Sequence, residues 1–139
     1  MMGLAFFDTN ILVYADDAAN RAKRARAISL IAEHQREGAL VVSLQVLQEY
    51  FVAATRKLGV DAAVAQSKVE LLARGRVVRF TERDVIASIE LHRLRQISFW
   101  DAMIVQAARV ANATVLYSEH MADGSAIAGI TIRNPFDRV

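Results

Sequence analysis

Short apolar runs alternate with longer segments of helical periodicity along the whole chain. The apolar runs, which predict strands, cover residues 4–7, 40–42, 77–80, 114–117 and 130–133. The segments with helical spacing cover about residues 20–36, 44–58, 61–73, 81–95 and 98–111. Strands separated by helices are typical of a parallel sheet with helices on both faces. The pattern therefore predicts an α/β fold, a three-layer α/β/α sandwich around a short, mainly parallel central sheet.

Capping residues define several of the helix boundaries. Ser43 and Ser98 each precede a predicted helix and can accept a hydrogen bond from its first turn. Thr81 and Asp84 have the spacing of a capping box, and Gly59 suits the end of the helix over residues 44–58. These local signals support the predicted order of elements.

Composition narrows the class of protein. The chain has 139 residues, of which 54% are hydrophobic, and a single proline, so we expect one domain over residues 1–139. No apolar run reaches the roughly 18 residues that a membrane-spanning helix needs, and the first residues lack the pattern of a secretory signal. We therefore expect a cytoplasmic protein with no membrane segment. The absence of cysteine excludes disulfides and thiolate-bound metals.

Three acidic residues stand beside apolar segments, where a charge without a partner is costly. Asp8 directly follows the first strand, at the sheet edge where α/β proteins bind ligands, although it can equally cap the next helix. Glu49 lies on a largely apolar helix and is either a ligand or a solvated residue. Asp101 lies in the first turn of an apolar helix that Ser98 already caps, which favours function over capping.

A further group of candidates follows the strand over residues 114–117. The stretch YSEHMADG places Ser118, Glu119, His120 and Asp123 in a loop at the carboxyl end of that strand. Loop acids and single histidines are usually solvated. Because the carboxyl ends of parallel strands meet at one edge of a sheet, however, we expect this loop to lie beside the three acids.

Carboxylates that converge on one edge cannot all stay ionised unless a cation neutralises them. Oxygen ligands without cysteine suit Mg²⁺ or Mn²⁺ better than zinc. Such ions bind phosphates and activate water, which favours hydrolysis of phosphodiester bonds. The sequence thus predicts a divalent-metal site.

Four segments, FFDTNILVY, SLQVLQEY, FWDAMI and LYSEHMADG, resemble in order and spacing the motif regions of the PIN-domain ribonucleases, in particular the VapC toxins of bacterial toxin-antitoxin modules. The resemblance implies a single PIN-like domain. It makes Asp8, Glu49 and Asp101 the catalytic and metal-binding acids. It also implies supporting roles for Thr9, Asn10 and Ser118.

The same resemblance implies an activity and partners. A protein of this kind is an endoribonuclease that depends on Mg²⁺, with Mn²⁺ able to substitute, and that acts on structured RNA such as tRNA or ribosomal RNA. Hydrolysis leaves a 5′-phosphate and a 3′-hydroxyl, because water attacks instead of the ribose 2′-hydroxyl. Such a toxin is inhibited by a cognate antitoxin protein, and we expect a homodimer.

The fourth acidic position departs from the family pattern. Related toxins often read SED in this loop, whereas His120 stands in place of that aspartate. Either Glu119 or Asp123 substitutes as a metal ligand, or His120 itself contacts the metal or the phosphate, or a second ion binds weakly. The alternative interpretation is a catalytically impaired PIN-like module that binds RNA or protein.

Two other enzyme classes fit less well. Haloacid-dehalogenase-like phosphatases need a second aspartate two residues after the first, where this chain has Asn10. Flap or 5′-nuclease-like enzymes carry more acids and a larger helical arch than this chain can hold.

Candidate binding surfaces are less sharply defined. The formal net charge of +2 is too small by itself to indicate nucleic acid. Candidates for contacts with RNA phosphates, unless they simply form solvated helix faces, are Arg21, Lys23, Arg24, Arg26, Arg93 and Arg95. A dimer or antitoxin surface, or by default ordinary core, is expected at Leu44, Val46, Leu47, Tyr50 and Phe51.

Overall fold

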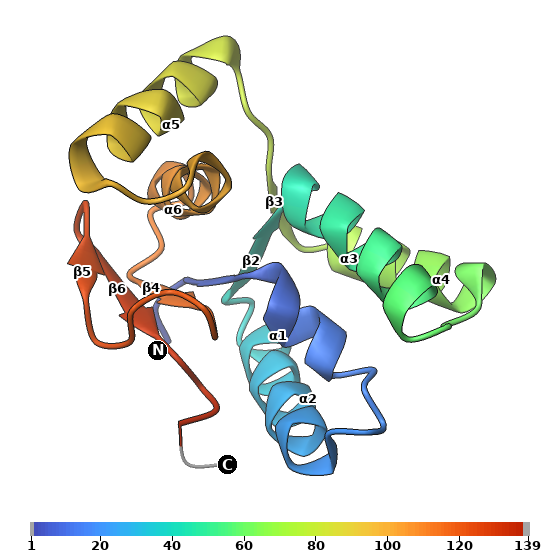
Figure 1. The fold of residues 1–139 in the computed structure, drawn as a ribbon. Coiled ribbons are helices and arrows are strands. Elements are labelled where there is room, and N and C mark those ends of the chain that lie inside the picture. Colours follow the sequence, from blue (N-terminus) through green and yellow to red (C-terminus); the bar gives the residue numbers. More distant parts are fainter. Residues whose placement is uncertain (1, 138–139) are drawn as a thin grey trace.

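The computed structural model describes residues 2–137 and has an α/β architecture (Figure 1). In chain order its elements are β1 (Ala5–Phe7), α1 (Thr9–Tyr14), α2 (Arg21–Arg36), β2 (Leu40–Ser43), α3 (Leu44–Lys57), α4 (Ala62–Ala73), β3 (Arg76–Val78), α5 (Glu82–Arg95), α6 (Phe99–Val110), β4 (Val115–Tyr117), β5 (Ala126–Ile127) and β6 (Ile130–Arg133). The expected fold class, a mainly parallel sheet flanked by helices, is confirmed.

The strands form one sheet in the order β3-β2-β1-β4-β6-β5, and all neighbouring pairs are parallel except β5 with β6. From β1 the chain first builds outward through β2 and β3, and later returns to the other side of β1 with β4. The strand order therefore reverses between β1 and β4. In open α/β sheets a crevice for ligands forms at such a reversal, outside the carboxyl ends of the strands.

The helices cover the sheet on both faces. Figure 1 shows α5 and α6 together on one side of the sheet, away from the group formed by α1 to α4. Helix α6 contacts β1, β2, β4 and β6, and α5 packs on the outside of α6. Within residues 2–137 no helix is both long and apolar enough to cross a membrane.

The core explains why the strand sequences are continuously apolar. Phe6, Phe7, Val41, Leu116 and Ile132 are fully buried although they lie on four neighbouring strands. A strand covered by helices on both faces needs apolar side chains at successive positions and does not show the alternation of a half-exposed sheet. The central strands are therefore held by packing from both sides.

The capping predictions are confirmed. Ser43 and Ser98 accept hydrogen bonds from the backbone N–H groups of Val46 and Asp101, and the Thr81 capping box is formed. These bonds are local, because each cap lies within three residues of its partner. Helix boundaries set by such bonds depend little on the rest of the fold.

Two strands differ from the sequence expectation. Strand β3 begins at Arg76 and ends at Val78, two residues before the end of the apolar run. Strand β5 was not expected; it pairs with β6 through a turn at Ala128 and Gly129, both with positive φ. A two-residue turn of this kind usually carries Asn-Gly or Asp-Gly, so Ala-Gly gave no hairpin signal.

Candidate active site

The carboxyl ends of β1 and β4 place Asp8 beside Ser118. Phe7 pairs with Tyr117 in the parallel register, so the next residue of each strand leaves the sheet at the same point. The Ser118 hydroxyl, which is fully buried, donates a hydrogen bond of 2.9 Å to Oδ2 of Asp8. This junction lies at the reversal of strand order, where a ligand crevice is expected.

Asp8 is both a helix cap and a buried pocket residue. Its Oδ1 accepts a hydrogen bond of 2.8 Å from the backbone N–H of Thr9 at the start of α1, so capping and function do not exclude each other. The side chain is almost inaccessible to water. Burial raises the pKa of Asp8, and the charge of Asp101 adds to that effect, while His120 and Ser118 oppose it.

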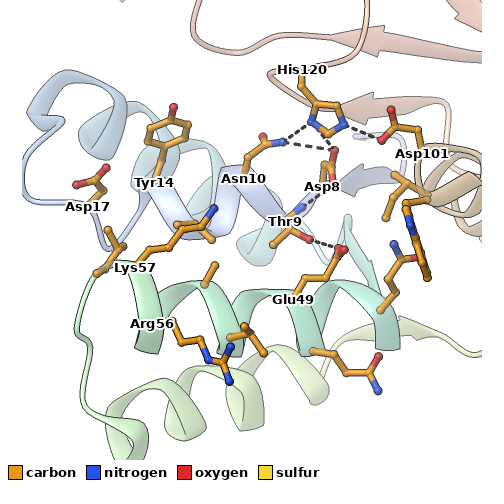
Figure 2. Close-up of a pocket in the computed structure, with 18 residues that line it drawn as sticks. Asp8, Thr9, Asn10, Tyr14, Asp17, Glu49, Arg56, Lys57, Asp101 and His120 are labelled. Carbon is orange, nitrogen blue, oxygen red and sulfur yellow. Dashed lines mark hydrogen bonds and ion pairs between the residues drawn. The ribbon is translucent and has the colours of Figure 1, made fainter. Parts of the chain in front are cut away.

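Glu49 and Asp101 reach the same pocket from other helices. The pocket, of about 880 Å³, is lined by Asp8, Glu49 and Asp101 together with Thr9, Asn10 and His120. Glu49 accepts a hydrogen bond of 2.8 Å from the Thr9 hydroxyl, which links α3 to α1. The structure thus brings together acids from the end of β1, from α3 and from α6, which lie 41 to 93 residues apart in the sequence (Figure 2).

The ring of His120 lies between two of these acids. Its Nε2 is 2.7 Å from Oδ1 of Asp101, and its Nδ1 is 3.5 Å from Oδ2 of Asp8. Figure 2 shows the imidazole bridging the two carboxylates, with Asn10 beside it. Burial lowers the pKa of His120, but its hydrogen bond to Asp101 and the nearby carboxylate charges outweigh this and raise the pKa above its ordinary value.

The pocket offers the kind of ligand atoms that a hard divalent cation prefers. Carboxylate oxygens from Asp8, Glu49 and Asp101 are the ligands that Mg²⁺ or Mn²⁺ prefers, and their summed negative charge favours a cation. Within residues 2–137, however, no three Asp, Glu or His side chains are close enough to hold one ion in common. The His120 ring lies between Asp8 and Asp101, and a cation shared by these two acids would have to replace it.

Two other candidates for the fourth position lie outside the pocket. Glu119 forms an ion pair with Lys23 and accepts a hydrogen bond of 2.7 Å from the hydroxyl of Tyr14. Asp123 accepts a hydrogen bond of 2.7 Å from the backbone N–H of Asn134. Of the three loop candidates, Glu119, His120 and Asp123, only His120 is among the described residues that line the pocket.

The Glu119 ion pair gives a stability prediction. Burial raises the pKa of Glu119, but hydrogen bonds from Lys23 and Tyr14 and the charge of Lys23 bring it below its usual value. A carboxyl with a depressed folded pKa adds stability that is complete above its unfolded pKa and is lost as the pH falls through the folded pKa. Glu119→Gln should therefore lower the free energy of unfolding at pH 7, by about 1 kcal/mol or less for a partly exposed pair.

Urea unfolding followed by circular dichroism measures this effect. The difference between wild type and Glu119→Gln should be present at pH 7 and should shrink as the pH falls below about 4.3, the ordinary pKa of glutamate. Glu90→Gln, which changes an exposed acid on α5, is the matched control. An equal loss of stability in both variants would show that the Lys23 contact contributes nothing specific.

The basic residues expected from the sequence lie outside the pocket. Lys23 is engaged with Glu119, and the Arg26 guanidinium donates a hydrogen bond of 3.2 Å to the Pro135 carbonyl. The others, at exposed or half-exposed positions on α2 and α5, are Arg21, Arg24, Arg93 and Arg95. Arg56 and Lys57, which were not expected from the sequence, do line the pocket.

The apolar residues singled out on α3 divide between core and surface. Val46, Leu47 and Tyr50 are buried, whereas Leu44 and Phe51 remain exposed. Trp100, beside Asp101, is 62% exposed and lines the pocket, so it does not shield Asp101 from water. Its ring is available to a ligand.

Several solved structures share this fold. VapC20 from Mycobacterium tuberculosis, a sarcin-ricin loop cleaving toxin, is 24% identical with a TM-score of 0.68, and the match covers 91% of this chain and 98% of that one. A toxin-antitoxin complex from Klebsiella pneumoniae is 20% identical with a TM-score of 0.68, covering 94% and 97%. DNA-bound VapBC from Salmonella typhimurium is 18% identical with a TM-score of 0.68, covering 96% and 99%.

The sequence itself matches the PIN domain family over residues 5–121. That span runs from β1 through the loop that carries His120, so it includes each acid that lines the pocket. No protein of curated function matches the sequence significantly. Because the family match covers most of its length, the chain belongs to the PIN domain family.

Proposed function

We propose that the protein is a divalent-metal-dependent endoribonuclease and the toxin of a toxin-antitoxin pair. The observation that carries this proposal is the convergence of Asp8, Glu49 and Asp101 on one pocket at the reversal of strand order. Membership of the PIN family and the likeness to VapC toxins support it. Mg²⁺ is the proposed cofactor, with Mn²⁺ able to substitute.

The chain's own residues have distinct roles in this proposal. Asp8, Glu49 and Asp101 would hold the cation, partly through water molecules, and would be the catalytic acids. A divalent cation bound there would neutralise the charge of the phosphate and activate water. Ser118 and Asn10 fix the Asp8 carboxylate through hydrogen bonds of 2.9 and 3.4 Å.

Thr9 and Asn10 also connect the acids to their surroundings. The Thr9 hydroxyl orients Glu49, and Asn10 accepts a hydrogen bond of 3.2 Å from the backbone N–H of Glu119. This second bond holds the loop that carries His120 against α1. The pocket is therefore positioned by contacts within the protein before any substrate arrives, which keeps the cost of ordering it low.

The substrate and the partners are proposed from the structural neighbours. VapC20 cleaves the sarcin-ricin loop, and VapBC assemblies pair a toxin with an antitoxin. We propose structured RNA, ribosomal RNA or tRNA, as the substrate, with a 5′-phosphate and a 3′-hydroxyl as product ends. A cognate antitoxin protein is the proposed inhibitor, and the toxin is proposed to be a homodimer.

A second candidate function has one observation in its favour. His120 bridges Asp8 and Asp101, so the imidazole, when protonated, offsets one of the two negative charges without a metal. A PIN-like module arranged in this way can bind RNA or protein without cleaving it. The ring has to turn aside before Asp8 and Asp101 share an ion, and a test of metal dependence separates the two functions.

The test uses purified, antitoxin-free protein with total tRNA and ribosomal RNA. Discrete cuts with 5′-phosphate ends are expected with Mg²⁺ or Mn²⁺, and EDTA should remove them because the acids then lack their cation. Primer extension maps the cuts, and ligation to an adaptor identifies the 5′ ends. Cutting that persists in EDTA would contradict the metal-dependent mechanism, and no cutting under any condition would favour the binding module.

A further inference from the structure

We propose that Arg56 and Lys57 form the phosphate-binding end of the active-site pocket and hold the RNA backbone a few nucleotides from the scissile bond. The inference rests on the proposed ribonuclease function and adds to it the path of the substrate. It starts from the position of these two side chains, which line the same pocket as Asp8, Glu49 and Asp101.

Helix α3 carries both ends of this pocket. Glu49 and Arg56 are seven residues apart, which is close to two helical turns and places them on one face. At 1.5 Å per residue their backbone positions are separated by about 10 Å along the helix axis. Figure 2 shows Arg56 and Lys57 on the part of α3 that lies farther from His120 than Glu49 does.

The charges of Arg56 and Lys57 are free to meet a ligand. Both side chains are exposed, and across residues 2–137 neither forms an ion pair or a side-chain hydrogen bond. Asp17, an acid at the same end, has its carboxylate occupied by the backbone N–H of Ala19 and the amide of Asn20. Several other cations are already engaged, because their side chains donate hydrogen bonds to protein oxygens. These are Lys23, Arg26, Lys68, Arg76 and Arg109.

The pocket thus has two electrostatic ends. Asp8, Glu49 and Asp101 gather at one end, whereas the described lining residues at the other end include two cations, Arg56 and Lys57, against one acid, Asp17. A polyanion entering this pocket meets repulsion at the acidic end unless a metal is present, and attraction at the other. Stacked nucleotides advance by about 3.4 Å along a strand, so about 10 Å corresponds to roughly three nucleotides.

The wall between the two ends suits unpaired bases. It includes the apolar side chains of Val13, Val52, Ala53 and Ile104, and Trp100 presents an exposed ring at the rim. Base stacking on an aromatic ring contributes about 1–3 kcal/mol and requires base faces that a duplex keeps covered. The pocket therefore favours an unpaired loop of a structured RNA over a continuous duplex.

Binding of a short oligouridylate, measured over a series of salt concentrations, tests this inference. The protein carries Asp8→Asn to prevent cleavage, and binding is followed by anisotropy of a fluorescein-labelled strand. Adding Arg56→Ala and Lys57→Ala should weaken binding on the order of tenfold at low salt. The slope of log K against log salt should fall by about 1.4, since each lost phosphate contact on a single strand removes about 0.7.

A second readout locates the ligand. Trp100 is the only tryptophan of the chain, so quenching of the intrinsic fluorescence by unlabelled oligouridylate reports occupancy of this pocket. The matched control is Arg79→Ala with Arg83→Ala, which removes two exposed positive charges outside the pocket. The control should keep both the affinity and the salt slope of the Asp8→Asn parent.

The outcomes separate the inference from the proposed function. If wild-type protein cleaves RNA but the Arg56 and Lys57 variant binds as tightly as its parent, with the same slope, the inference fails and the function stands. An equal loss in the Arg79 and Arg83 control also overturns it, because general charge then explains binding. If Arg56 and Lys57 instead receive an acidic protein segment, RNA binding stays unchanged, which again overturns the inference. If wild-type protein neither binds nor cleaves RNA, the proposed function itself fails.

Discussion

Asp8→Asn is expected to reduce RNA cleavage by at least about 100-fold while leaving the fold as stable as the wild type or more stable. The loss follows because the pocket loses its most buried carboxylate, and one missing electrostatic contact in a site of this kind costs about 10² to 10³ in rate. Cleavage of a mapped RNA substrate in Mg²⁺ measures the first effect, and thermal unfolding measures the second.

Stability should not fall, because ionised Asp8 is costly in its buried site. Its raised pKa means that the folded state disfavours the charged form, and asparagine is neutral and of similar size. The asparagine oxygen still accepts the hydrogen bond from Thr9 that caps α1, and its amide group can donate to the Ser118 hydroxyl in place of accepting from it. Asp123→Asn, outside the pocket, is the control and should retain cleavage. Full activity of Asp8→Asn would point to a contaminating nuclease and would remove the basis of the assignment.

His120→Asp is expected to tighten binding of Mg²⁺ or Mn²⁺ by about tenfold or more and to increase cleavage. The change replaces the bridging imidazole by a fourth carboxylate between Asp8 and Asp101. Without metal, the added repulsion should lower the melting temperature. With metal, the variant should regain more stability than the wild type, because an ion that binds only the folded state stabilises it according to its affinity.

His120→Asn separates removal of the ring from addition of a carboxylate. The asparagine variant lacks the imidazole that occupies the space between Asp8 and Asp101, yet it adds no charge. The metal-induced rise in melting temperature should be largest for His120→Asp, intermediate for His120→Asn and smallest for the wild type. If the wild type shows the largest rise, His120 assists metal binding and the bridging interpretation is wrong.

The sequence predicted the elements well because their signals are local. Ser43 and Ser98 lie three residues from the N–H groups they cap, and the continuous apolar runs at β1 and β2 reflect burial on both faces. The hairpin of β5 escaped prediction because its turn at Ala128 and Gly129 lacks the usual residue pair and is stabilised by its place beside β6.

The placement of the acids near one edge of the sheet could also be predicted from the sequence. Asp8 follows β1 and Ser118 follows β4, and parallel strands end on the same side. Glu49 and Asp101 were open to two interpretations each, since helical position alone does not say which way a helix faces. Their shared pocket requires that α3 packs against α1 while α6 packs against the sheet.

The orientation of the loop after β4 depends on contacts with distant segments. Glu119 turns to Lys23 and Tyr14, which lie about a hundred residues earlier, and His120 turns into the pocket instead. The sequence shows that these two residues are neighbours in the chain, but it does not show which distant residue each side chain contacts. The same holds for Arg56, because its place in the lining of the pocket depends on how α3 packs.

The sequence by itself thus determined the order of strands and helices apart from β5, the helix caps and the set of acids near one sheet edge. It did so because backbone hydrogen bonds, side-chain periodicity and parallel pairing act over short or regular distances. Only the tertiary structure decided that His120 bridges Asp8 and Asp101 and that Arg56 and Lys57 complete the pocket. Those contacts join residues far apart in the chain, whose distances are set by packing of the whole core.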